Sequence, residues 1–236
     1  MTTPVVLLHG ARVSRTMWRP QLAALERAGR PAVAIDLPGH GTRIAERFTL
    51  AGATAAVEEA VDAVGGRAVV VGMSLGGYLG IHHAALRPDQ VVGLLAGACC
   101  SVPDQPATAA WQLAVRGITR LPDGGAWLNQ RLVDLALPPE GAAACAEGGF
   151  ALAVMGDLLA EVRRIDVLAD LARVRCPVWL VNGSLDHFRL QERAFLRAAP
   201  GARRVLVRGA THLSSVVRPV AFTRVLLEAL DDLDGV

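Results

Sequence analysis

Ser74 is the residue of this chain best placed to act as a nucleophile. Residues 72–76 read Gly-Met-Ser-Leu-Gly, which fits the pattern G-x-S-x-G. The valine-rich run at 67–71 predicts a strand, and 77–87 predicts a helix that ends before Pro88. Ser74 would then lie on a sharp turn between strand and helix, where side chains at the flanking glycines would clash. Such a turn presents a hydroxyl to a pocket; the alternative is a glycine-rich turn with a bystander serine.

A serine hydroxyl is almost wholly protonated at neutral pH, so it needs a neighbouring base and an acid that orients the base. Of the six histidines, His212 follows the last predicted strand, at 204–207. In a parallel sheet this loop opens at the same edge as residues 72–76, so His212 is the predicted base. The other histidines are less suited. His82 and His83 lie on the predicted helix after Ser74, His9 and His40 each lie at a glycine turn, and His187 directly follows Asp186.

Asp186 is the predicted acid because it lies in the loop that follows the strand at 177–181. The loop at 97–100, after the preceding strand, carries no carboxylate. Asp36 also ends a strand, but Leu-Pro-Gly follows it, and we interpret it as a residue that caps a turn. The order Ser74, Asp186, His212 along the chain is the order associated with this kind of elbow.

The elements that would position these residues alternate along the chain. Apolar strands are predicted at 5–8, 32–35, 67–71, 91–96, 177–181 and 204–207. Helices are predicted at 17–28, 54–64, 77–87, 191–198 and 219–230. Fully apolar strands that alternate with helices indicate an α/β fold, doubly wound, with a mostly parallel sheet of about six strands covered on both faces.

Residues 101–165 break this alternation. Prolines divide them into short helical pieces, and no strand is predicted there. We expect a helical insertion after the fourth strand that covers the end of the sheet, with residues 1–100 and 166–236 forming the core. Trp111 and Trp127 are its largest apolar side chains, so at least one should line the pocket; the alternative is that both pack inside the insertion.

The composition limits the classes of function. The chain has 236 residues, 52% of them hydrophobic, yet no apolar run of the roughly 18 residues that a membrane helix needs. Its net charge of +2 argues against a nucleic-acid or membrane partner, and it carries no lysine for Schiff-base chemistry. The four cysteines lack C-x-x-C spacing and no secretory signal precedes the first strand, so we expect reduced, buried thiols in a cytoplasmic protein.

Taken together, the motifs resemble those of the α/β-hydrolases of the serine-esterase type, over nearly the whole chain. Five motifs carry the resemblance, in the family's order: an H-G loop at 9–12 with Ser14 and Trp18 downstream, a D-x-P-G-x-G turn at 36–41, the elbow at 72–77, a G-x-x-D loop at 183–186, and the final His212. The insertion resembles the family's cap domain in its position and helicity.

The resemblance implies an oxyanion hole formed by the backbone N–H groups of Ala11 and Leu75. The first strand matches the family's third, which trims the sheet to about six strands and is similar to the methylesterase and hydroxynitrile-lyase branch. Those lyases use a lysine that this chain lacks. Dehalogenases and epoxide hydrolases of the family carry aspartate at the position of Ser74. A further departure is Thr42-Arg43, which replaces a small serine.

The sequence therefore predicts a serine hydrolase that cleaves a carboxylic ester, thioester or lactone of a small to medium apolar substrate through an acyl-enzyme on Ser74, with neither metal nor cofactor. The alternative is a hydrolase-like binder or receptor of a small molecule, with slow or no turnover. Arg12 would either meet a substrate carboxylate near the oxyanion hole or be a solvated surface arginine. The residues expected to line the pocket are Arg12, Trp111, Trp127, His187 and Leu213.

Overall fold

The computed structural model describes residues 2–103, 117, 120, 121, 123 and 125–235, and in this part of the chain six parallel strands form one sheet in the order β2-β1-β3-β4-β5-β6. The strands are β1 (Val5–Leu8), β2 (Ala32–Ile35), β3 (Ala68–Met73), β4 (Val91–Gly97), β5 (Val178–Gly183) and β6 (Arg203–Val207). All neighbouring pairs are parallel. The predicted fold class is confirmed, and the sheet is wholly rather than mostly parallel.

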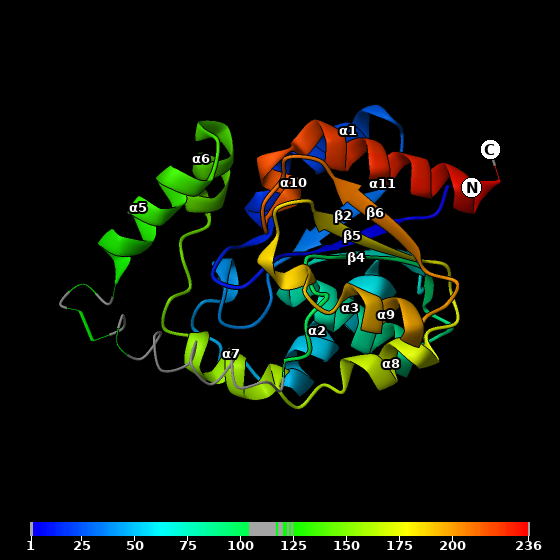
Figure 1. The fold of residues 1–236 in the computed structure, drawn as a ribbon, viewed down its shortest axis with the longest axis horizontal. Helices are drawn as coiled ribbons and strands as arrows, with labels where there is room; N and C mark the ends of the chain where they lie inside the picture. The colour runs from blue at the N-terminus through cyan, green and yellow to red at the C-terminus, as the bar shows by residue number, and fades with distance from the viewer. Residues whose placement is uncertain (1, 104–116, 118–119, 122, 124, 236) are drawn as a thin grey trace.

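Helices cover both faces of the sheet (Figure 1). On one face lie α1 (Arg19–Arg27), α10 (Ser214–Val217) and α11 (Pro219–Asp234), and on the other α2 (Leu50–Ala63), α3 (Leu75–Leu86), α8 (Val167–Arg173) and α9 (Glu192–Ala198). Short 3-10 turns precede or follow the strands at η1 (Arg15–Trp18), η2 (Gly41–Arg43) and η3 (His187–Arg189). No described helix is both long and apolar enough to span a membrane.

Alternate residues of each strand divide the core into two clusters. In β1, Val5 and Leu7 pack with α1 and α11, whereas Val6 and Leu8 pack with α2 and α3. This follows from the strand period of two, which sends successive side chains to opposite faces. A strand buried on both faces must be apolar at every position, which explains why the sequence shows continuous apolar runs rather than alternation.

The chain between β4 and β5 is helical where the structure describes it, as predicted for a cap after the fourth strand. It contains α5 (Ala126–Ala136), α6 (Pro139–Glu147) and α7 (Met155–Val162). Figure 1 shows α5 and α6 on the side of the sheet opposite the two termini. Two contacts fix α6 to the core, because Gly141 lies against Val216 and Gly148 against Ser14. Trp111 lies outside the described residues.

Element boundaries differ from the prediction where local hydrogen bonds decide them. The helix expected to start at residue 54 starts at Leu50, because the Thr49 side chain accepts a hydrogen bond from the Gly52 N–H and caps the helix earlier. The helix expected from residue 17 begins as the turn η1, and α1 follows with Pro20 in its first turn. All four cysteines are free, and Cys176 is the one that is only partly buried.

Candidate active site

Ser74 occupies the turn between the end of β3 and the start of α3. Its backbone has φ 55° and ψ −111°, a conformation that residues other than glycine rarely adopt and that costs on the order of 1–3 kcal/mol. A Cβ atom at Gly72 would overlap the carbonyl oxygen of Gly76, and one at Gly76 would overlap that of Leu8. Both glycines are therefore needed for the close approach of backbone segments that the sequence motif predicts.

The structure brings His212 and Asp186 into hydrogen-bond contact with this turn. His212 Nε2 lies 2.9 Å from Ser74 Oγ, and His212 Nδ1 lies 3.0 Å from Asp186 Oδ1. A carboxylate can only accept, so Nδ1 carries the proton and Nε2 is free to accept from the Ser74 hydroxyl. This arrangement can remove the hydroxyl proton as the oxygen attacks, and the carboxylate can stabilise the positive imidazole ring that results.

Asp186 is held as a charged acceptor. Its side chain is buried, and Oδ1 also accepts a hydrogen bond of 2.9 Å from the Phe188 N–H. Burial alone would raise the pKa of Asp186, but the hydrogen bond and charge of His212, with that N–H, hold it below its ordinary value. The second oxygen, Oδ2, is buried without a hydrogen-bond partner among the described residues. Both hydrogen bonds that Asp186 accepts therefore go to Oδ1.

Backbone N–H groups suited to an oxyanion lie beside Ser74. Leu75 is the first residue of α3, and the N–H groups of a first helical turn have no partner within the helix. The loop that carries Ala11 is tied to the same turn, because Gly76 N donates to His9 O at 3.1 Å. A Cβ placed on Gly10 would lie 3.6 Å from the Cβ of Ser74. The loop after β1 and the start of α3 thus approach each other at the hydroxyl.

His82 and His9 have partners other than Ser74. His82 Nδ1 lies 2.7 Å from Asp170 on α8, away from Ser74 as predicted. His9 accepts from the Leu37 N–H at Nε2 and donates to Gly10 O from Nδ1, so its ring is neutral. Burial, together with the neighbouring His40, lowers the pKa of His9 to about 3. His9 therefore fixes two loops to each other and has no free nitrogen for catalysis.

Asp36 organises the turn that follows β2. It accepts hydrogen bonds from the Arg15 N–H at 2.8 Å and from both the N–H and the hydroxyl of Thr42 at 2.9 Å. The interpretation of Asp36 as a turn-capping residue therefore agrees with its contacts. Thr42, one of the two residues that depart from the family pattern, gains a structural role here because its hydroxyl donates to this carboxylate.

Of the residues expected to line a pocket, three lie near Ser74 or His212. A Cβ on Gly10 would lie 3.5 Å from Leu213 Cδ2, and the His187 ring centre lies 5.5 Å from that of His212. Arg12 follows Ala11 directly and donates to Asn129 of α5 at 3.2 Å. Trp127 is 66% exposed, and the Arg131 guanidinium lies over its ring.

Two residues of this region were not foreseen from the sequence. The Phe188 ring centre lies 4.5 Å from that of His212, and Asn129 reaches Arg12 from a helix more than a hundred residues away. Phe188 stands two residues after the predicted acid, and that position was its only signal. Asn129 had none. Among the described residues, no group of three or more His, Cys, Asp and Glu side chains could hold a metal ion.

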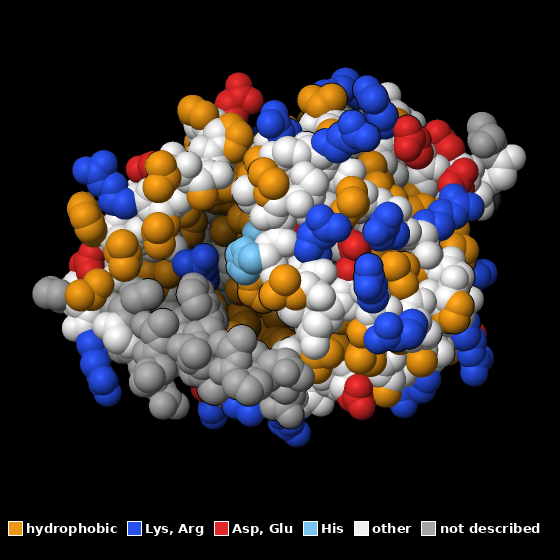
Figure 2. Space-filling view, in the orientation of Figure 1, with side chains coloured by type: hydrophobic (Ala, Val, Ile, Leu, Met, Phe, Trp, Pro, Cys, Tyr) orange, Lys and Arg blue, Asp and Glu red, His pale blue; other side chains and the backbone are white. Residues whose placement is uncertain are grey.

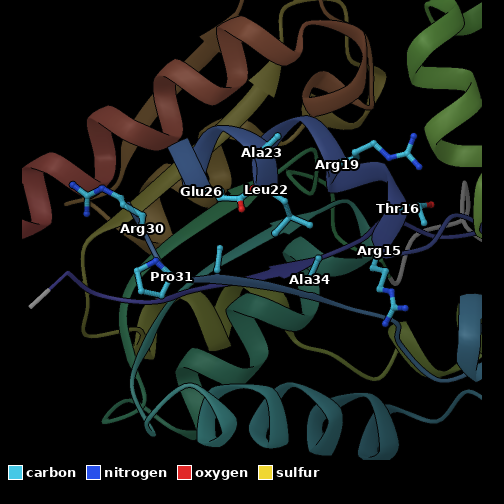
Figure 3. A pocket seen from close by; sticks show the side chains of 10 residues that line it. Arg15, Thr16, Arg19, Leu22, Ala23, Glu26, Arg30, Pro31 and Ala34 are labelled. Atoms are coloured by element: carbon cyan, nitrogen blue, oxygen red, sulfur yellow. The ribbon is translucent and has the colours of Figure 1, made fainter. Parts of the chain in front are cut away.

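The surface is hollowed between the α5–α6 segment and the sheet, with a histidine and an arginine side chain facing the hollow (Figure 2). A separate groove of about 680 Å³ runs between α1 and the edge strand β2 (Figure 3). Its lining contains Arg15, Arg19 and Arg30 but none of the three residues Ser74, Asp186 and His212. This groove is therefore separate from the candidate catalytic residues.

Comparison with known proteins places this site in a family. Residues 5–225 match the alpha/beta hydrolase family. The chain is 30% identical to "Putative carbamate hydrolase RutD" of Enterobacter cloacae over 97% of its length and 91% of the relative's. It is also 30% identical to the pimeloyl-[acyl-carrier protein] methyl ester esterase of Edwardsiella ictaluri, over 96% and 93%. A malate-bound thermophilic esterase from Thermogutta terrifontis has a similar fold, with a TM-score of 0.82, 23% identity, and coverage of 98% and 90%.

The chain belongs to the alpha/beta hydrolase family. The expectation drawn from its five motifs is thus confirmed at the level of the family and fold.

Proposed function

We propose that this protein hydrolyses a carboxylic ester, thioester or lactone through an acyl-enzyme on Ser74, with His212 as the base and Asp186 as the acid that orients it. The observation that supports this most strongly is the continuous pair of hydrogen bonds from Ser74 Oγ through His212 to Asp186. The three residues come from loops after β3, β5 and β6, which open at one edge of a parallel sheet, where such folds bind their ligands.

The proposed reaction follows from the protonation states at rest. Ser74 Oγ forms a bond to the substrate carbonyl carbon as its proton passes to His212 Nε2, and the carbonyl oxygen becomes an anion. The N–H groups of Ala11 and Leu75 donate to this anion; loss of one such donor costs on the order of 3 kcal/mol of barrier. His212 then gives its proton to the departing alcohol. A water molecule then attacks the acyl carbon as one of its protons passes to His212 Nε2. The bond between this carbon and Ser74 Oγ breaks, His212 returns the proton to Ser74, and the acid is released.

We further propose that residues 101–165 form a cap and that 1–100 and 166–236 form the catalytic core. The attachment of α6 to Ser14 and Val216 supports this, because Ser14 follows Ala11 closely in the loop after β1 and Val216 lies in α10, just after His212. A cap fixed there would exclude water from the acyl group and shape its pocket. Leu213, His187 and Arg12 are the proposed pocket residues of the core.

An ester is the proposed substrate class because serine is the nucleophile and the relative from Edwardsiella ictaluri is named a methyl ester esterase. The carbamate hydrolase relative is named for a carbonyl that carries nitrogen as well as oxygen, which the same attack would serve. A binder with slow turnover remains the alternative. It would react once at Ser74 and then stop.

The test combines labelling with turnover. A fluorophosphonate should add one mass tag to the peptide that contains Ser74, and 4-nitrophenyl esters of increasing acyl length should turn over repeatedly. Ser74→Ala should fold and lose this turnover by several orders of magnitude.

Ser101→Ala is the matched control, because Tyr78 still reaches the Ser101 carbonyl at 2.8 Å and the residue has no part in the proposed chemistry. Full activity in Ser74→Ala would refute the proposal. Labelling of Ser74 without steady turnover of any ester would favour the binder.

A further inference from the structure

Arg12 is a partly buried cation that has no charged partner in the described part of the chain. Its side chain donates to the neutral Asn129 amide oxygen at 3.2 Å, and no carboxylate of the described residues lies within ion-pair distance. Burial lowers the pKa of the guanidinium, although an arginine stays protonated. Arg30, by contrast, lies between Asp231 and Asp234 at 2.6 and 2.5 Å. Partly buried positive charge without compensation is costly unless a ligand supplies the anion.

Asn129 adds a second donor that has no acceptor. Its side chain is only 5% exposed, its oxygen is occupied by Arg12, and its Nδ2 group is buried without a partner among the described residues. The helix α5 buries this amide while leaving Trp127 66% and Leu135 86% exposed. A helix normally turns its apolar side chains inward, so this inversion points to a polar requirement at Asn129.

The backbone around Arg12 is held in a costly conformation. Arg12 has φ 67°, in the left-handed region that favours glycine. Its carbonyl accepts from the Ala151 N–H at 2.9 Å, so the segment after α6 fixes it in place. Strain of this kind persists where the surroundings enforce it, and it clusters at functional sites. Here it holds a guanidinium one residue beyond Ala11, whose N–H belongs to the proposed oxyanion hole.

We propose that Arg12 and Asn129 form a subsite for a carboxylate carried by the substrate. The substrate class would then be a carboxylate-bearing ester, such as the half-ester of a dicarboxylic acid. A guanidinium and an amide N–H₂ group side by side match the two oxygens of a carboxylate. The inference rests on the proposed hydrolysis at Ser74. It adds that the substrate carries a negatively charged group near the ester bond that is cleaved.

The experiment compares esters that differ only in this charge. Monomethyl glutarate and monomethyl adipate are paired with methyl pentanoate and methyl hexanoate, in which a methyl group replaces the carboxylate. A third pair, the butanoate ester of 3-hydroxypropanoate and propyl butanoate, places the charge on the alcohol. Acid release in a pH-stat gives kcat/KM, and the readout is the ratio within each pair. The wild-type protein should prefer the charged member of at least one pair.

Two variants test the subsite in different ways. Asn129→Asp puts a carboxylate beside Arg12 and so occupies the guanidinium internally, while Arg12→Gln removes the charge. Each should lower the preference ratio by roughly tenfold to a hundredfold, the usual effect of hydrogen bonds to a charged group. Arg131→Gln removes an exposed cation from the same helix and should leave the ratio unchanged.

Binding without turnover separates this inference from the proposed function. Calorimetry with adipate and the Ser74→Ala variant should show binding that Asn129→Asp weakens at least tenfold, by the same loss of charged hydrogen bonds. If no ester is cleaved but adipate binds in this manner, hydrolysis fails and the subsite stands. If esters are cleaved with a ratio near one, or with a ratio that neither variant changes, the subsite is refuted.

Discussion

Replacing Asp186 by asparagine should reveal how much of the chemistry depends on its charge. Oδ1 accepts from both His212 Nδ1 and the Phe188 N–H, whereas Oδ2 has no partner among the residues that the structure describes. An asparagine would keep its oxygen at the Oδ1 position, because an amide N–H₂ group there would face the Phe188 N–H. The proton should then stay on His212 Nδ1. Asp186→Asn therefore removes the negative charge and leaves the hydrogen bonds and the tautomer in place.

The magnitude follows from the separation of the charges. His212 Nδ1 and Asp186 Oδ1 are 3.0 Å apart, and the charge of each group is spread over several atoms. Unit charges about 4 Å apart attract by about 4 kcal/mol at an effective dielectric constant of about 20. That attraction acts on the imidazolium of the transition state and much less on the neutral resting ring. Its loss corresponds to about a thousandfold in kcat/KM.

The assay is kcat/KM for a 4-nitrophenyl ester, with the rate of fluorophosphonate labelling as a separate measure of the first step. Both should fall together, and circular dichroism should show an unchanged fold. Asp170→Asn is the matched control, because Asp170 pairs with His82 at 2.7 Å in the same kind of buried Asp–His contact. A loss of less than tenfold in Asp186→Asn, or an equal loss in Asp170→Asn, would show that Asp186 does not support the base.

The other predictions concern stability. Burial lowers the pKa of His9 from 6.5 to about 3. Below pH 6.5 the unfolded chain therefore binds a proton at His9 that the folded chain does not bind. Stability is therefore full above that pH and declines toward pH 3, with a loss of about 2 kcal/mol from His9 by pH 5. Urea unfolding between pH 5 and 8 should show a shallower dependence in His9→Gln, and an identical slope would contradict the burial argument. Trp127→Ala should change the free energy of unfolding by less than about 1 kcal/mol, since its ring is exposed and contributes mainly a contact with Arg131. A loss of the roughly 3–5 kcal/mol typical of a buried tryptophan would mean that the ring packs inside the cap in solution.

Most of the fold could be predicted from the sequence because its strands are buried on both faces. A run such as residues 68–71 is apolar at every position, and that pattern fits a covered parallel sheet. The loops at the carboxyl edge then follow from connectivity alone, which is how Ser74, Asp186 and His212 were selected. Their hydrogen bonds depend on backbone positions that the glycines at 72 and 76 make possible, and these glycines are visible in the sequence.

The cap region could not be predicted in the same way. Its helices mix apolar and polar side chains around their surfaces, so apolar character did not tell which face turns inward. Trp127 was expected to line the pocket or to pack inside the insertion and is 66% exposed, whereas Asn129 was not considered and is buried. The contact between Asn129 and Arg12 joins two segments that are 117 residues apart in the chain, and no local pattern encodes the angle at which they meet. Likewise, no local pattern in the sequence predicts that the Phe188 ring lies against His212.

The histidines show why residue type alone does not define a catalytic base. His9 and His212 both donate from Nδ1 to an oxygen. They differ in what approaches Nε2. The donor to His9 is the backbone N–H of Leu37, which keeps its proton at any pH the protein experiences, so this contact holds the chain and nothing more. The group at His212 Nε2 is the hydroxyl of Ser74, whose proton passes to the ring in the proposed attack. In the proposed mechanism, the hydroxyl at Nε2 and the carboxylate at Nδ1 are what distinguish His212 as a base from the structural ring of His9.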